Sequence, residues 1–507
     1  MSSAAEKTNI NILMVSMALQ GHVNPMLNFA KHLVTKGVHV TIATTEEGRA
    51  RMLKNTDQNL SDSGIRLEFF SDGLSIDFDR SDTKTVINTL REKGPKNLSN
   101  LIENLSKNQT FSGVIVNPFV PWAVDVAAEY QIPCALLWIQ ATACYSIYYR
   151  YIKNTDVFPK LEDPNEKVQL PGLPTLEVRD LPSMILPSSP IQFKEIIADF
   201  IKALDKVKWV LGASFFEIED EIVKSMDSLT PIYNIGPLIP PSLLGEKETS
   251  NVSADMWNAE DSCIEWLNTK PNSSVIYISF GSLVVLSKNQ MSNLATALKN
   301  SNNNFLWVVK PANNGGYASE DPAYELPKEF LEETQGRGLI VKWCAQTKVL
   351  QHPAVACFIS HCGWNSLLET LITGVPVIGY PSWTDQPTNA MLVEKVFKNG
   401  VRIKAGEDGV GSVEEIERCV YEVVEGPNAG EYKKRALEIK EAAKKALQEG
   451  GSSSANVNKF LGELKDKNGP KSKKPTVIGR LGSTMGTGIT KIKEMLSRVI
   501  YGSGCGR

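Results

Sequence analysis

The chain has 507 residues, of which 42% are hydrophobic and 22% are charged, and a single core seldom grows to that length, so we expect two domains. The apolar content and the ordinary counts of 36 Gly and 27 Pro exclude a disordered or collagen-like chain. The net charge of −3 is unevenly spread: residues 465–507 hold ten basic and two acidic residues, so the first 464 residues carry −11. An acidic body argues against a nucleic-acid partner.

The N-terminal segment and the cysteines indicate the compartment. A short polar start leads directly into a strand-length apolar run, without the features of a signal peptide. The longest apolar segments fall short of the ~18 residues that a membrane helix needs. The eight Cys and five His show no CxxC or HExxH spacing, which predicts reduced thiols and no metal site. We therefore expect a cytoplasmic monomer without firm membrane association.

Short β-branched runs alternate with helix-period segments along most of the chain. Strands are predicted at 12–15, 38–41, 113–116, 134–138, 275–280, 305–309, 339–341, 356–359 and 375–379, and helices at 25–33, 122–129, 289–298 and 433–447. Pro25 suits the first position of its helix. The Pro-rich segment 235–242 interrupts the alternation and reads as a linker. The pattern predicts an α/β fold of two doubly wound Rossmann-like domains that face a cleft.

The first candidate site is the sequence QGHVNP at 20–25, which follows the first predicted strand. A dinucleotide-binding protein carries GxGxxG at this place, and that motif is absent. His22 at the end of a strand is suited to act as a general base, because its ordinary pKa of ~6.5 allows proton abstraction at neutral pH. The ordinary structural alternative is a turn histidine that bonds to the backbone.

The second candidate site begins at 360–366, which follows a predicted strand and opens a helix. The free N–H groups and the dipole of such a helix start favour an anion. Gly363 and Ser366 are small enough to let an anion approach, and His361 can donate a further hydrogen bond. The alternative for Asn365 is a helix cap.

Further polar and aromatic residues flank this helix. Glu369 lies one turn inside it, where a carboxylate can accept hydrogen bonds from ribose hydroxyls. Trp343 can stack on a base, and Asp385 with Gln386 forms a polar pair suited to a sugar. Taken singly, Trp343 could be core and Asp385 could be an N-cap, but their joint occurrence favours a sugar-nucleotide site.

The 44 residues 343–386 resemble the signature segment of plant-type UDP-dependent glycosyltransferases. The resemblance runs from about residue 10 to about residue 464 and includes GHVNP at 21–25, SFGS at 279–282 and EGGSS at 449–453. It implies the GT-B fold, with the acceptor in the N-terminal half and the sugar nucleotide in the C-terminal half. The implied organisation is an acceptor-binding domain at 1–236, a linker at 237–254, a UDP-sugar-binding domain at 255–450, a helical region at 451–466 packing near the N-terminal domain, and an atypical basic tail at 467–507.

The resemblance also implies a role for each motif position. The base and ribose of the donor would be bound by Trp343, Ala345, Gln346 and Glu369, the diphosphate by Ser282, His361, Gly363, Asn365 and Ser366, and the transferred sugar by Trp364, Asp385 and Gln386. A terminal Gln in this segment is associated with glucose. UDP-glucose is then the donor substrate, and no metal or separate cofactor is expected.

His22 would be the catalytic base of a direct inverting displacement. Most relatives carry an Asp after the strand at 114–116 that pairs with this histidine, whereas this chain has Asn117. An Asn can orient the imidazole but cannot stabilise the imidazolium by charge, so the base should be weaker. Asp125 lies within the following predicted helix, so we do not expect it to be the partner of His22.

A weaker base suits an acceptor that is already ionised at neutral pH, as a carboxylic acid is and a phenol is not. The segments 117–122 and 137–140 also look like the subgroup that makes glucose esters of aromatic acids. We therefore hypothesise an aromatic carboxylate acceptor with phenolic hydroxyls as secondary targets. The alternatives are a flavonoid or other phenolic O- or C-glucosyltransferase, a nicotinamide enzyme, and a catalytically silent sugar-nucleotide-binding protein. The aromatic residues Phe119, Trp122, Trp138 and Tyr145 are acceptor-site candidates that could equally be core.

The basic tail stands apart from this resemblance. Ile489, Ile492 and Leu496 recur at helical spacing among basic residues, which would allow weak binding to a membrane surface. A helix of about twelve residues is marginal in isolation, so we favour a dispensable extension.

Overall fold

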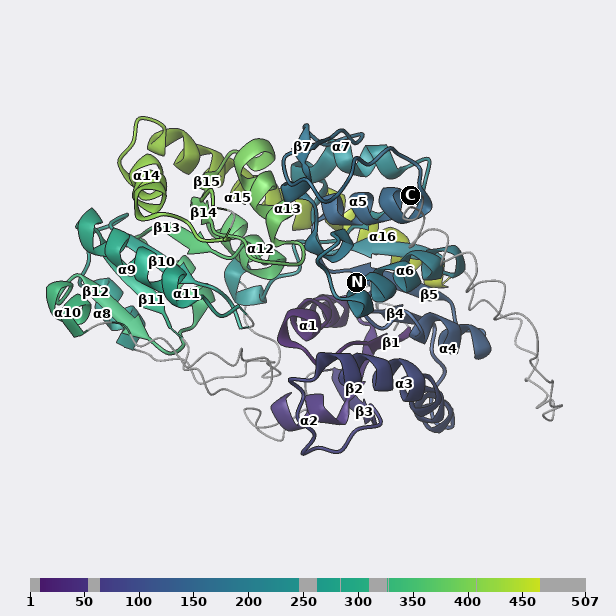
Figure 1. The fold of residues 1–507 in the computed structure, drawn as a ribbon. Coiled ribbons are helices and arrows are strands. Elements are labelled where there is room, and N and C mark those ends of the chain that lie inside the picture. The colour runs from purple at the N-terminus through teal and green to yellow at the C-terminus, as the bar shows by residue number, and fades with distance from the viewer. Residues whose placement is uncertain are drawn as a thin grey trace, which may run out of the picture. The chain divides into compact units, whose positions relative to one another are not determined.

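The computed structural model describes residues 10–52, 64–245, 262–282, 284–309, 326, 328–406 and 408–465. The beginning of the chain, part of the predicted linker (246–254) and the predicted tail (467–507) lie outside the described residues. Each strand predicted from the sequence overlaps an observed strand, and each predicted helix overlaps an observed helix. Figure 1 shows the elements in chain order, coloured from purple to yellow.

The first half of the chain forms a parallel sheet with strand order β3-β2-β1-β4-β5-β8-β9. Its strands are β1 Asn11–Val15, β2 His39–Thr45, β3 Ile65–Phe70, β4 Gly113–Val116, β5 Cys134–Trp138, β8 Trp209–Gly212 and β9 Tyr233–Asn234. Its helices are α1 Gln20–Thr35, α2 Glu46–Met52, α3 Thr83–Ser106, α4 Ala123–Glu129, α5 Thr142–Lys153, α6 Ile191–Ala203 and α7 Phe216–Met226. Short elements complete it: β6 Lys167–Val168, β7 Leu176–Glu177, η2 Val178–Asp180, η3 Ser183–Ile185, η4 Leu204–Lys206 and η5 Pro241–Leu244.

Alternate residues of β1 pack on opposite faces of this sheet. Ile12 and Met14 belong to a core shared with α1, whereas Leu13 and Val15 belong to a core shared with α3 and α5. Side chains of a strand alternate between faces, so an unbroken apolar run is what a sheet covered on both sides requires.

The second half forms a parallel sheet with strand order β12-β11-β10-β13-β14-β15. Its strands are β10 Val275–Ser279, β11 Asn304–Val308, β12 Gly338–Val341, β13 Val355–Ser360, β14 Val377–Gly379 and β15 Gly400–Arg402. Its helices are α8 Ser262–Asn268, α9 Lys288–Ser301, α10 Lys328–Glu333, α11 Gln346–Leu350, α12 Trp364–Thr373, α13 Gln386–Met391, the π-helix η6 Leu392–Phe397, α14 Val413–Val424 and α15 Ala429–Leu447.

The last helix of the described chain, α16 Ser452–Lys465, returns to the first sheet. Val457, Phe460 and Leu464 join the core that covers the α1 face of that sheet. The ring of Phe460 meets Trp209 of β8 edge-on, with ring centroids 5.1 Å apart.

The strand orders place one topological switch point in each sheet. In the first sheet β1 lies between β2 and β4, and in the second β10 lies between β11 and β13. The connections leave these neighbouring strands in opposite directions, which opens a crevice at their carboxyl ends where α/β proteins bind ligands. The two candidate sites follow β1 and β4 in one sheet, and β10 and β13 in the other.

Candidate active site

The first site combines one residue from each side of the β1–β4 switch point. His22 follows β1 and Asn117 follows β4, and the Nδ1 atom of His22 lies 3.1 Å from Oδ1 of Asn117. Asn117 is fully buried. Asp125 is exposed within α4 and pairs with Lys206 at 2.6 Å, as expected of a residue that is not the partner of His22.

The hydrogen bonds of Asn117 define the tautomer of His22. The Oδ1 atom of Asn117 accepts a hydrogen bond of 3.0 Å from the backbone N–H of Phe119, so the amide oxygen must face that donor. The same oxygen then accepts the Nδ1–H of His22, which leaves the lone pair of the neutral imidazole on Nε2. The amide nitrogen of Asn117 is buried and has no hydrogen-bond partner among the described residues.

The surroundings of His22 keep its ring neutral. Burial lowers the pKa of His22 from 6.5 to about 4, although the hydrogen bond to Asn117 opposes this shift. The ring of Phe119 lies edge-on to the imidazole, with ring centroids 4.6 Å apart and an interplanar angle of 89°. At neutral pH, His22 is therefore an oriented but weak base.

The helix that carries His22 begins earlier than predicted. The structure starts α1 at Gln20, so His22 stands in the first helical turn and Pro25 lies inside the helix, which makes the placement of Pro25 at the first helical position wrong. Proline has no N–H, so the carbonyl of Gly21, four residues before it, lacks its intrahelical donor. The Nδ2 atom of Asn365, from the second half of the chain, donates to this carbonyl at 2.9 Å.

The second site is built around His361, at the β10–β13 switch point. Gly281 has a φ of 67°, and a Cβ at this position would lie 2.7 Å from Nε2 of His361. A Cβ on Gly363 would lie 2.5 Å from the same nitrogen. The imidazole therefore lies against two glycines at which a side chain would crowd it, and Ser282 follows Gly281 in the chain.

The start of α12 presents the predicted anion-binding residues. Gly363 is the N-cap and makes no side-chain capping bond, so the capping alternative for Asn365 is wrong. Asn365 and Ser366 are partly exposed in the first turn. The indole of Trp364 is instead buried against Phe397, with ring centroids 6.4 Å apart, so only its backbone lies at the helix start.

A hydrogen-bond network holds the residue predicted to bind ribose. The Nε2 atom of Gln346 donates to Glu369 Oε2 at 2.7 Å and to Ser366 Oγ at 3.1 Å. The hydroxyl of Tyr277 donates to Oε1 of Gln346 at 3.1 Å. Gln346 thus orients the carboxylate of Glu369, a role that the sequence did not predict. Tyr277 was not predicted either, because its position in β10 resembles that of any other strand residue.

Trp343 and Ala345 flank this network. Trp343 packs against the hydrophobic core that includes Tyr277 of β10, but it is only partly buried. One part of its side chain thus belongs to the core, and another part remains accessible. Ala345 is the N-cap of α11, and its carbonyl accepts hydrogen bonds from Lys348 and Val349.

The polar pair after β14 is tightly bonded. The carboxylate of Asp385 accepts hydrogen bonds from Thr384 Oγ1 at 2.6 Å and from Asn389 Nδ2 at 2.7 Å. Burial raises the pKa of Asp385, while these bonds and one from the backbone of Trp364 act in the opposite direction. Asp385 also occupies the N-cap position of α13, as its structural alternative proposed, but without a capping bond to that helix.

Gln386 uses only part of its hydrogen-bonding capacity. Its Oε1 atom accepts from the backbone N–H groups of Ser382 at 3.0 Å and Trp383 at 3.2 Å. Among the described residues, its side-chain nitrogen donates to none, so both of its N–H groups remain for another acceptor.

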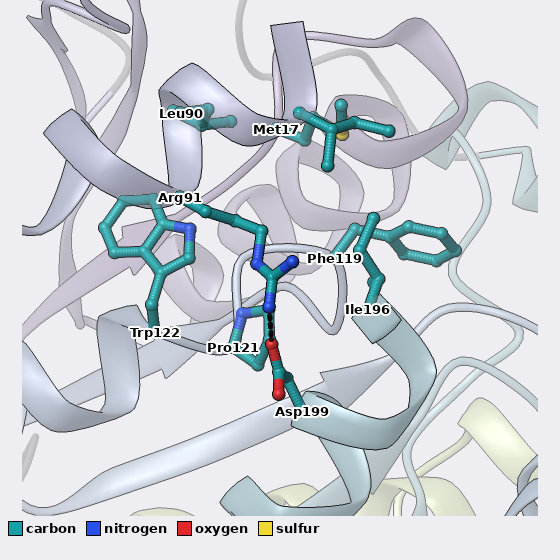
Figure 2. A pocket seen from close by; sticks show the side chains of 9 residues that line it. Met17, Leu90, Arg91, Phe119, Pro121, Trp122, Ile196 and Asp199 are labelled. Atoms are coloured by element: carbon teal, nitrogen blue, oxygen red, sulfur yellow. Dashed lines mark hydrogen bonds and ion pairs between the residues drawn. The ribbon is translucent and has the colours of Figure 1, made fainter. Parts of the chain in front are cut away.

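A pocket lies next to Phe119 in the first half of the chain (Figure 2). Most of its lining is apolar, and its polar side is an ion cluster in which Arg91 donates to Glu195 at 2.6 Å and to Asp199. Glu195 and Asp199 raise the pKa of Arg91 against the effect of burial. The pocket is lined by Met17, Ile87, Leu90, Arg91, Phe119, Pro121, Trp122, Ile196 and Asp199.

Two of the four aromatic acceptor candidates line this pocket. Phe119 and Trp122 do so, whereas Trp138 and Tyr145 are fully buried core residues. The indole N–H of Trp122 is buried without a hydrogen-bond partner among the described residues. Arg91 and its two acids carry no recognisable motif, so sequence reasoning missed them.

Two further kinds of site are absent from the described residues. They contain no group of three or more His, Cys, Asp or Glu side chains that could hold a metal ion. None of their helices is both long and apolar enough to cross a membrane.

Comparison with known proteins identifies the family. A family model described as "UDP-glucoronosyl and UDP-glucosyl transferase" matches residues 252–444. UDP-glycosyltransferase 84B2 of Arabidopsis thaliana is 47% identical over 452 residues, which cover 89% of this chain and 99% of that protein. Gallate 1-beta-glucosyltransferase 84A24 of Punica granatum is 39% identical over 469 residues, which cover 90% of this chain and 89% of that protein.

A solved structure gives the same result for the fold. Os79 from O. sativa, in complex with UDP, aligns with a TM-score of 0.78 and 30% identity, covering 89% of this chain and 100% of that chain. The chain belongs to the UDP-glycosyltransferase family. It is an enzyme of GT-B fold that uses a UDP-sugar as donor, which confirms the predicted fold and enzyme class and excludes the nicotinamide alternative.

Proposed function

We propose that this enzyme transfers glucose from UDP-glucose to the carboxylate of a small aromatic acid, with inversion at the anomeric carbon, and acts on phenolic hydroxyls as secondary acceptors. The observation that carries this proposal is the His22–Asn117 pair. The imidazole is oriented by a neutral amide and has a pKa of about 4, so it is poorly suited to remove a proton from a phenol of pKa ~10. A carboxylic acid arrives already ionised and needs no base.

The relatives support the same acceptor class. The name of the Punica granatum relative specifies glucosyl transfer to gallate, an aromatic acid. Phe119 and Trp122 offer apolar and aromatic surface in the pocket beside His22, as a flat aromatic acceptor requires. We assign residues 1–236 to the acceptor and 255–450 to the donor, and we expect the enzyme to act as a monomer in the cytoplasm.

For the donor, we propose the roles that the resemblance implied for the residues of the second site. Trp343 stacks on the uracil, with Ala345 and Gln346 beside it, and Glu369 accepts hydrogen bonds from the ribose. The start of α12, with Ser282, His361, Asn365 and Ser366, receives the diphosphate. Gln386 donates its unused N–H groups to the sugar.

In the transfer step, a carboxylate oxygen of the acceptor forms a bond to the anomeric carbon while the bond from that carbon to the diphosphate oxygen breaks. The electron pair leaves with UDP, and the helix N–H groups and the helix dipole stabilise the developing charge. With a phenolic acceptor, Nε2 of His22 takes the hydroxyl proton during attack.

The direct test is an acceptor screen with UDP-glucose, using gallate- and cinnamate-type acids against flavonoids. Product mass counts the sugars, and loss of the sugar in mild alkali distinguishes an ester from an ether or a C-linked product. We expect alkali-labile monoglucosides of the acids. Glucosylation of flavonoid hydroxyls or ring carbons alone would overturn the carboxylate proposal.

A further inference from the structure

The loop before α13 is held in an unusual backbone conformation. Thr384 has a φ of 59°, in the left-handed region that is costly for a β-branched residue. It directly precedes Asp385 and Gln386. A costly conformation persists only where its surroundings impose it, so the groups that hold Thr384 also determine where the next two residues point.

A residue from the other half of the chain holds Thr384. The backbone N–H of Ser183 donates to the carbonyl of Thr384 at 2.7 Å, and the backbone N–H of Thr384 donates to Oγ of Ser183 at 2.7 Å. Both backbone groups of the left-handed residue are therefore bonded to Ser183, which lies 201 positions earlier in the chain.

The segment that carries Ser183 is firmly anchored. We call residues 178–185 the strap. Asp180 of the strap is fully buried. The backbone carbonyl of Asp180 accepts a hydrogen bond from Thr388 Oγ1 at 2.7 Å, and the carboxylate of Asp180 pairs with Arg402 and Lys395. Burial alone would raise the pKa of Asp180, but Arg402 and Lys395 hold it below its ordinary value. The strap thus stays ionically fixed to the second half at neutral pH.

A ring contact supports the same loop from a second direction. Phe193 of α6 meets Trp383 with ring centroids 5.9 Å apart in an edge-on arrangement. Trp383 is also one of the two residues whose backbone N–H groups donate to Oε1 of Gln386. The first half of the chain therefore contacts the loop at 382–386 through two neighbouring residues, Trp383 and Thr384.

We propose that Ser183 is a positioning residue for the sugar of the donor: through Thr384 it sets the direction of Asp385 and Gln386, so that an element of the acceptor half determines sugar selectivity. This inference rests on the proposed function, in which Gln386 binds the sugar. The contacts described for the UDP part, Gln346 with Glu369 and His361 with Gly281 and Gly363, all come from the second half of the chain, so we expect Ser183 to affect recognition of the sugar more than recognition of UDP.

The test compares Ser183→Ala with Ser183→Thr, which keeps the hydroxyl, and with Ser188→Ala, an exposed serine of the same loop. For each full-length variant, the measurements are the KM for UDP-glucose, the inhibition constant of UDP, the preference for UDP-glucose over UDP-galactose, and the Tm. We expect Ser183→Ala to raise the KM for UDP-glucose and to reduce the sugar preference by about fivefold each, the worth of one hydrogen bond. The inhibition constant of UDP should change by less than about twofold. Ser183→Thr should restore the KM for UDP-glucose and the sugar preference.

The proposal is overturned if Ser183→Ala leaves the KM and the sugar preference unchanged, or if it weakens UDP and UDP-glucose equally, as general loosening of the fold would. Failure of the proposed function is a separate result, in which the wild type glucosylates no aromatic acid. Calorimetric titration with UDP and with UDP-glucose still tests Ser183 in that case, because it requires no acceptor.

Discussion

The two switch-point sites are built in opposite ways. The proposed donor site is dense in polar side chains that bond to one another within one stretch of chain, residues 343–386. The pocket proposed for the acceptor collects mostly apolar side chains from Met17 to Asp199, with an ion cluster at its edge. A diphosphate and a ribose demand fixed hydrogen-bond geometry and so leave a motif, whereas an aromatic acceptor is recognised by shape, which scattered residues can supply.

The largest effect on activity is expected from a substitution of His22. His22→Ala should lower kcat/KM for a phenolic acceptor by about 10²–10⁴-fold, the usual contribution of a general base. It should lower the same parameter for a carboxylate by no more than about tenfold, because that acceptor has no proton to lose. Initial rates with matched acid and phenol acceptors measure the difference, and His39→Ala, an exposed histidine, is the control. Equal losses with both acceptors would contradict the proposed division of roles.

On the donor side, Gln346→Glu should weaken UDP binding by about tenfold, the effect of one pKa unit of charge interaction. The new carboxylate would face Glu369 across the present 2.7 Å hydrogen bond and repel it. Calorimetric titration with UDP checks this change, with Thr347→Ala as the neighbouring control. If Gln346→Glu changed the KM for the acceptor and left UDP binding unchanged, Gln346 would belong to acceptor binding instead of donor binding, and the prediction would be wrong.

The smallest effect is expected at the ion cluster of the proposed acceptor pocket. Glu195→Gln removes one of the two acids that neutralise Arg91, leaving the guanidinium better able to attract an anionic acceptor. The KM for carboxylate acceptors should fall by about two- to threefold, as befits a partly exposed ion pair, and the KM for phenols should stay constant. Equal changes in the KM for carboxylates and for phenols would show that the ion cluster of Arg91 does not recognise the charge of the acceptor.

Local sequence was sufficient where a residue's role depends on its own element. The strand alternation placed His22 and residues 360–366 directly after strands, because apolar periodicity and small residues at strand ends are local properties. The start of α1 could not be predicted, since the carbonyl freed by Pro25 is satisfied by Asn365 from a distant helix. The roles of Ser183 and Arg91 likewise depend on partners about 100–200 positions away that no local pattern announces.

The pH dependence of phenol glucosylation tests directly whether the neutral amide of Asn117 leaves His22 a weak base. Protonation of Nε2 abolishes the base, so the rate falls as the pH drops through the pKa of His22. For the wild type, kcat/KM should hold steady through pH 6.5 and decline only near the pKa of about 4.

The decisive comparison is with Asn117→Asp. The unpartnered amide nitrogen becomes a carboxylate oxygen, so no hydrogen bond is lost, and the new charge should raise the pKa of His22. The acid limb should move toward neutral pH, and phenol glucosylation should rise relative to ester formation. A wild-type limb near pH 6.5, or an Asn117→Asp enzyme with the same limb and the same product ratio, would contradict the claim.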